Sequence, residues 1–247
     1  MRPAIVVLWC LVALVIFPPV QARAHDSADE VTKLSSEAAM VAAWEFARCS
    51  VKRSRDDVRT IIDPKFGTTV WSEQDEQIRL KRMWKLAGKN ASCMRPGDSL
   101  KAPPRLFFDM LGGAMFLDKH RDSGLPDYSN IPPLFSTDSV KEAKVGRQRI
   151  GIALRLFAEC VFRLNPGGVR ALLQSRPFSK GEGNSLSELQ PAMGTCVPAE
   201  EGAQLKLSKI TLRQYLSMAA YLVDEAYDLS KQNKTSEMTR EQGRLYA

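Results

Sequence analysis

The stretch Phe157-Ala158-Glu159-Cys160, followed nine residues after the cysteine by Val169-Arg170, decides the fold because the chain contains it twice. The earlier copy reads Phe46-Ala47-Arg48-Cys49 and is followed by Val58-Arg59. The offset of 111 residues stays constant from Phe46 to Ile62, which excludes isolated coincidences of single residues. The sequence therefore predicts a helical unit that is written twice.

The first two helices of each copy follow from apolar spacing and from capping residues. Apolar side chains recur every three or four residues, the period of one helix face. We expect that face to be buried in both copies, with these members: Ala39, Ala42, Phe46 and Cys49; then Ile150, Ala153, Phe157, Cys160 and Leu164. Ser54 is predicted to cap the next helix of the first copy, and Asn165 with Pro166 that of the second.

Capping boxes predict the start of a third helix in each copy, at Ser72 with Asp75 and at Ser185 with Glu188. The preceding Gly181-Glu182-Gly183 is interpreted as a loop. In the first copy Ile78, Met83 and Leu86 are expected to face inward.

A fourth helix is predicted in each copy from a core stripe spaced four, three and four residues apart. Its members are Leu106, Met110, Gly113 and Leu117 in the first copy, and Leu212, Leu216, Ala219 and Val223 in the second. Glycine costs about 1 kcal/mol in a helix interior relative to alanine. We therefore expect another helix to approach closely at Gly112-Gly113.

The predicted fold class is all-α, with two tandem homologous four-helix units and one disulfide inside each unit. The expected organisation of the chain is a signal peptide (1–24), a flexible lead-in (25–36), helical repeat 1 (37–118), a linker containing Pro and Gly (119–145), helical repeat 2 (146–229) and a polar tail (230–247).

The N-terminal segment has the features of a secretory signal peptide. Arg2 precedes an uncharged apolar run from Ala4 to Phe17, and Ala22-Arg23-Ala24 fits a cleavage site. An uncleaved anchor is the alternative, but the run is shorter than the ~20 residues that a membrane span needs. Cleavage after Ala24 lowers the net charge from +7 to +5 and leaves no integral span. We expect a periplasmic or secreted protein.

Cleavage would also remove Cys10 and leave four of the five cysteines. An even number of cysteines in an exported chain indicates disulfides, and four cysteines allow three pairings. A unit that carried its own disulfide before duplication would pair Cys49 with Cys93 and Cys160 with Cys196. The leader, the paired F-A-x-C units and the late cysteines resemble uncharacterised exported proteins of Gram-negative bacteria with a duplicated helical cysteine repeat. That resemblance implies a compartment and a repeat, but no activity.

The sequence contains no recognisable catalytic, cofactor or metal motif, and no cofactor is expected. Phosphate-binding, dinucleotide-binding, zinc-protease and serine-hydrolase patterns are absent. His120 lies between Asp118 and Asp122 and could act as a general base, although charges at a solvated helix end explain the run equally well.

Basic side chains gather in the first repeat and form a possible face for an anionic partner: Lys52, Arg53, Arg55, Arg59, Arg79 and Arg82. The leading hypothesis is an exported non-catalytic protein that binds an envelope protein or an anionic polymer. Nucleic acid is not expected, because no aromatic residues alternate with these cations. The alternative is a secreted enzyme or small-ligand binder that uses a cleft between the repeats, with His120, Asp118 and the aromatic linker residues at its edge.

Overall fold

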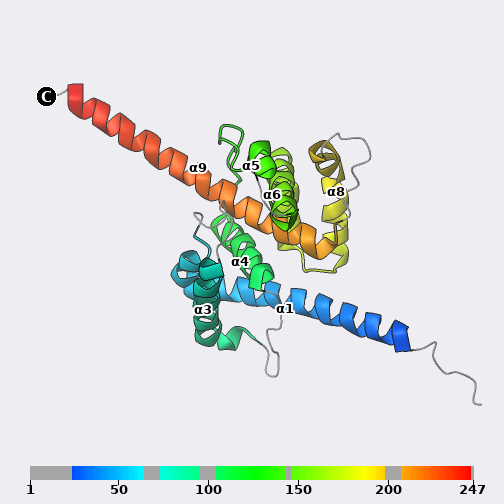
Figure 1. Cartoon of the computed structure of the whole chain (residues 1–247). Coiled ribbons are helices and arrows are strands. Elements are labelled where there is room, and N and C mark those ends of the chain that lie inside the picture. Colours follow the sequence, from blue (N-terminus) through cyan, green and yellow to red (C-terminus); the bar gives the residue numbers. More distant parts are fainter. Residues whose placement is uncertain (1–23, 64–72, 95–103, 143–145, 198–206, 246–247) are drawn as a thin grey trace, which may run out of the picture. The chain divides into compact units, whose positions relative to one another are not determined.

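The computed structural model describes residues 24–63, 73–94, 104–142, 146–197 and 207–245. All regular structure within these ranges is helical, which confirms the all-α class (Figure 1). The helices are α1 (Ala24–Ile61), α3 (Glu73–Lys89), the short 3-10 helix η1 (Ala91–Cys93), α4 (Pro104–Lys119), α5 (Thr137–Glu142), α6 (Gly146–Leu164), α7 (Pro166–Gln174), α8 (Lys180–Cys196) and α9 (Lys209–Leu245). The chain divides into residues 1–35 and 36–247, and the core, the disulfides and the sites described below belong to the second unit.

Both ends of the described chain are helical where the sequence suggested irregular structure. Residues 25–36, where we expected a flexible lead-in, continue helix α1, and most of the predicted polar tail at 230–247 belongs to α9. The physical reason is that no Pro or Gly interrupts residues 24–61 and no Pro interrupts 230–245. A helix can therefore extend beyond its apolar stripe.

The predicted boundaries between the first two helices of each copy are present in the backbone. Ser54 leaves helical geometry inside α1 (φ −145°, ψ 48°). Asn165 has nearly the same geometry between α6 and α7 (φ −143°, ψ 70°). Its side-chain oxygen accepts a hydrogen bond from the Gly168 amide at 2.8 Å, and Pro166 begins α7. The predicted cap at Asn165 is confirmed.

The predicted start of α8 is wrong by about one and a half turns, and Gly181-Glu182-Gly183 is not a loop. Helix α8 begins at Lys180, and Ser185 is a buried interior residue. Ser179 is the cap, because its hydroxyl accepts from the Glu182 amide at 3.2 Å while the Glu182 carboxylate accepts from the Phe178 amide at 2.6 Å. These two bonds satisfy amides at the helix start, which compensates for two glycines in the first turn.

Both predicted disulfides are present. Cys49 of α1 is bonded to Cys93 at the end of η1, and Cys160 of α6 is bonded to Cys196 at the end of α8. The first bond joins the first helix of its predicted repeat to the short helix that follows the third, and the second bond joins the first helix to the end of the third.

Buried apolar side chains form two clusters that interlock through α4 and α9. The first is formed mainly by α1, α3 and α4 and also includes Tyr221 and Leu222 of α9. The second is formed mainly by α6, α7, α8 and α9 and also includes Phe116 of α4. Helices α4 and α9 meet closely at Gly112 and Gly113, as expected from the sequence.

Four apolar residues expected on buried faces are exposed, and one of them is Ala153 in the middle of α6. Ile150 is 63% exposed and Leu164 is 54% exposed, at the two ends of α6, and Ile78 of α3 is 45% exposed. On α6, Phe157 is buried as predicted, but the other buried apolar residues are Leu154, Ala158, Val161 and Phe162, because the buried face is rotated relative to the predicted stripe.

Candidate functional site

The structure does not bring the six predicted basic residues together on one face. Arg79 is buried, with 4% of its surface exposed, and its guanidinium lies 5.7 Å from the ring centre of Phe108. The prediction that Arg79 faces an anionic partner is therefore wrong. Arginine can occupy such a position because its stem is apolar and its flat cation packs against an aromatic ring.

Three more of these residues contact neighbouring helices. Arg55 of α1 pairs with Asp118 of α4, and Arg59 of α1 lies 3.5 Å from Glu225 of α9. Arg82 of α3 donates to the carbonyl of Thr60 at 2.9 Å. Arg55, Arg59 and Arg82 are exposed but have partners within the chain, and Lys52 and Arg53 are exposed as well.

A groove beside Lys52 gathers a different set of cations. It has a volume of about 310 Å³ and lies between α1, α4, the turn after α4, and α7. We call it the cationic groove; its lining residues are Arg48, Val51, Lys52, Ala114, Leu117, Asp118, Arg121 and Gln174. Sequence analysis missed Arg48 and Arg121, because Arg48 was interpreted as part of the repeated F-A-x-C unit and Arg121 as part of the charged run around His120.

Like charges face each other in this groove. Burial lowers the pKa of Arg48, and the nearby Arg121 lowers it further. The guanidinium of Arg48 stacks 4.9 Å from the ring centre of Trp44 and donates to the Gln174 carbonyl at 3.4 Å. The one acid among the described lining residues, Asp118, is shared between Arg55 and Arg121. The groove consequently keeps an excess of positive charge.

His120, the candidate general base, lies in the interior. Only 5% of its surface is exposed, and its Nε2 is 2.8 Å from the Asp224 carboxylate. The same carboxylate accepts from the Tyr128 hydroxyl at 2.9 Å and from Lys119 Nζ at 2.8 Å. Asp118, the predicted neighbour of His120, pairs elsewhere, so the structure does not assemble these two residues into one site.

The groups around Asp224 have pKa shifts that favour stable hydrogen bonds to its carboxylate. Burial lowers the pKa of Lys119, but hydrogen bonds to Asp224 and Asp228 outweigh burial and raise it overall. Burial raises the pKa of Tyr128, and the negative charge of Asp224 raises it further. Lys119 therefore stays charged and Tyr128 stays a neutral donor, and both stabilise the buried carboxylate.

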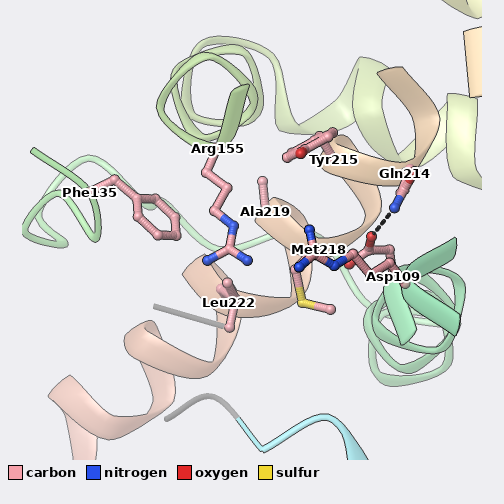
Figure 2. A pocket seen from close by; sticks show the side chains of 9 residues that line it. Asp109, Phe135, Arg155, Gln214, Tyr215, Met218, Ala219 and Leu222 are labelled. Atoms are coloured by element: carbon pink, nitrogen blue, oxygen red, sulfur yellow. Dashed lines mark hydrogen bonds between the residues drawn. The ribbon is translucent and has the colours of Figure 1, made fainter. Parts of the chain in front are cut away.

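A second cluster of ionisable groups lines a small pocket of about 40 Å³ (Figure 2). Arg155 reaches into it from α6 and Phe135 from the segment between α4 and α5, opposite side chains of α4 and α9. We call it the Asp109 pocket; its lining residues are Arg105, Asp109, Phe135, Arg155, Gln214, Tyr215, Met218, Ala219 and Leu222. Helices from both predicted repeats and an aromatic residue of the linker thus meet in one place.

The Asp109 carboxyl has an unusual environment. Burial raises its pKa to about 7, although Gln214, Arg155, Arg105 and Arg79 all act in the opposite direction. Gln214 Nε2 donates to Asp109 Oδ2 at 2.6 Å. Burial also lowers the pKa of Arg155 and raises that of Tyr215. A cluster of shifted groups in a pocket is a candidate site for binding or proton transfer.

A sequence signal for this pocket existed and was missed. Asp109 interrupts the apolar run from Leu106 to Leu111, and an acid inside such a run is a candidate for burial beside a partner.

Within the described ranges, no three His, Cys, Asp or Glu side chains are grouped so that they could hold a metal ion. No helix there is long and apolar enough to cross a membrane. Comparison of the chain with protein-family models, with curated proteins and with solved structures finds no match.

Proposed function

We propose that this chain is an exported, non-catalytic helical protein that binds an acidic segment of another protein in the cationic groove. The observation that carries the proposal is the arrangement of Arg48, Lys52 and Arg121 around one groove, where Arg48 and Arg121 repel each other. A bound carboxylate would relieve that repulsion and accept hydrogen bonds from either guanidinium.

The walls of the groove favour a protein segment over a polyanion. Val51, Ala114 and Leu117 line it together with the cations. Apolar walls contribute binding energy only to a partner that also has apolar groups, which a sugar-phosphate or sulfated polymer largely lacks. We therefore expect the partner segment to alternate acidic and apolar side chains.

Export is the second part of the proposal. Two disulfides are compatible with an oxidising compartment outside the cytoplasm, where such bonds persist. Together with the signal-peptide features of residues 1–24, they support a periplasmic or secreted location. N-terminal sequencing of the exported protein tests this: a mature chain that begins at His25 is the expected result, and retention of residues 1–24 would contradict it.

We further propose that two tandem four-helix units arose by duplication. The similar backbone angles of Ser54 and Asn165, which are 111 residues apart, support this, as does the equivalent placement of the two disulfides. An experimental structure tests the idea. Residues 46–62 should superpose on 157–173 helix for helix, and a failure to superpose would refute a common origin.

Fluorescence anisotropy with a labelled peptide of alternating glutamate and leucine tests the groove. The purified oxidised protein should bind this peptide, and added salt should weaken binding because exposed charges are screened. The double variant Arg48→Ala/Arg121→Ala should bind at least about tenfold more weakly, a loss of about 1.4 kcal/mol.

Arg82→Ala is the matched control, because Arg82 is an exposed cation of the predicted face that does not line the groove. Its affinity should equal that of the unmodified protein. An equal loss in the Arg82 variant would mean that net charge, and not the groove, attracts the peptide. Stronger binding of heparin than of the peptide would favour an anionic polymer as the partner.

A further inference from the structure

The Asp109 pocket is separate from the cationic groove and has its own chemistry. The described residues that line the two sites have no member in common. The pocket is also the more enclosed of the two. It therefore suits a small molecule and not a protein segment.

Charge and apolar surface divide the pocket into two parts. Arg105 and Arg155 supply two guanidiniums, with the Tyr215 hydroxyl and the Gln214 amide nearby. Phe135, Met218 and Leu222 supply an apolar surface, and the Arg155 guanidinium lies 5.7 Å from the ring centre of Phe135. A ligand that satisfies both parts has an anionic head and a short apolar body.

We infer that the Asp109 pocket binds a small organic acid, with its carboxylate at Arg105 and Arg155 and its apolar body against Phe135, Met218 and Leu222. Two guanidiniums match the planar geometry of a carboxylate. Apolar walls disfavour inorganic phosphate, which has no group to place there. The volume of about 40 Å³ limits the body to a few carbon atoms.

Asp109 makes this binding depend on pH. The groups around it are Arg105 on its own helix, Arg79 on α3, Arg155 on α6, and Gln214 with Tyr215 on α9. When Asp109 is protonated, the pocket has two cations and no acid among its described residues, and the carboxyl can donate a hydrogen bond. When Asp109 is ionised, it repels a bound carboxylate. Affinity should therefore fall as the pH rises through the pKa of Asp109, which is about 7.

An NMR titration of the purified oxidised protein with butyrate, butyramide and butylamine tests the inference. These probes have similar shapes and differ in charge. Butyrate should bind, and its dissociation constant should rise about tenfold between about pH 6 and about pH 8, because the protonated fraction of Asp109 falls by about that factor. Tighter binding of butylamine, or no binding of any probe, would overturn the proposal.

Variants of Asp109 and Arg105 separate the role of the acid from that of the cation. Asp109→Asn keeps a neutral side chain of the same shape, so it should bind butyrate with no pH dependence in this range. Arg105 is exposed at its position, so Arg105→Gln should keep the fold and bind butyrate at least about fivefold more weakly. Arg53→Gln, which removes an exposed cation outside the pocket, should have no effect.

Two further outcomes would refute the inference. If Arg53→Gln weakens binding as much as Arg105→Gln, the effect is one of net charge alone. If inorganic phosphate displaces butyrate at equal concentration, the site recognises any anion and its apolar surface is irrelevant. Unchanged circular dichroism of each variant, measured in parallel, separates loss of the site from loss of the fold.

Discussion

Gly113 of α4 lies so close to Ser217 of α9 that a Cβ atom added to the glycine would stand 2.9 Å from Ser217 Oγ and 3.0 Å from Ser217 Cβ. The serine hydroxyl donates to the Arg213 carbonyl at 2.8 Å, so it cannot turn away without losing that bond. At the adjacent Gly112 the nearest atoms would be 3.4 Å away, which is ordinary contact. The close approach of α4 and α9 therefore depends on one glycine more than on the other.

Gly113→Ala should lower the free energy of unfolding by about 1–2 kcal/mol, because overpacking at this contact exceeds the gain in helix propensity. Gly112→Ala should be neutral or stabilising by up to about 1 kcal/mol. Urea denaturation of both variants measures the difference. Adding Ser217→Gly to Gly113→Ala should restore room at the contact. If the two alanine variants are equally stable, the packing argument is wrong.

Local patterns and symmetry predicted much of this fold. The repeated F-A-x-C units led to the correct cysteine pairing, and the glycine pair correctly indicated where α4 meets another helix. Asn165 with Pro166 is a cap whose bonds lie within four residues. Each of these depends on neighbours along the chain or on a repeated sequence pattern, both of which a sequence displays.

Features that depend on distant partners were not predictable. Arg79 reads as part of a basic run, and only the ring of Phe108 explains its burial. Glu182 stabilises the start of α8 and is itself held by Arg213, 31 residues away. The cationic groove combines Arg48 and Arg121 from separate segments. Tertiary packing decides which charged side chains are buried and which of them lie close together. The periodicity of apolar residues does not reveal either property.

Glu182 and Arg213 form a buried ion pair, with Oε1 and Nε 2.9 Å apart and side chains 3% and 1% exposed. Glu182→Gln keeps the shape but leaves the arginine charge uncompensated, so unfolding should become easier by about 3 kcal/mol. Glu188→Gln, which changes an exposed acid of the same helix, should cost less than about 0.5 kcal/mol. Equal midpoints in urea for the two variants would contradict a stabilising role for the pair.

The raised pKa of Asp109 makes the folded state less stable as the pH rises. Between the ordinary carboxyl pKa near 4 and the folded value of about 7, the folded chain holds a proton that the unfolded chain releases. The contribution of Asp109 to the free energy of unfolding is therefore fully present below about pH 4 and is lost as the pH rises through about 7. Asp109→Asn should raise stability by about 2 kcal/mol at pH 7.5 and by much less at pH 4.5. A gain that is the same at both pH values would refute the assignment.

Asp224 and Asp228 both pair with Lys119, but only Asp224 also binds His120 and Tyr128. Asp224→Asn should cost about 3 kcal/mol, because it removes the charge that several buried donors share. Asp228→Asn should cost less than about 1 kcal/mol, since that side chain is 35% exposed. The part of each contribution that comes from Lys119 should be lost above pH 10.5, as Lys119 loses its proton at its raised pKa. Thermal unfolding of both variants measures the contrast.

The two disulfides should contribute similarly and independently, because they close loops of 44 and 36 residues. Chain entropy predicts about 4 kcal/mol for each, with only a small advantage for the longer loop. Cys49→Ser should leave Cys93 open to thiol reagents while Cys160 stays bonded to Cys196, and Cys160→Ser should give the reverse. Non-reducing peptide mapping of both variants reads the remaining bond directly. Labelling of Cys160 in the Cys49 variant would mean that the cysteines exchange partners. The two disulfides would then not be independent of each other.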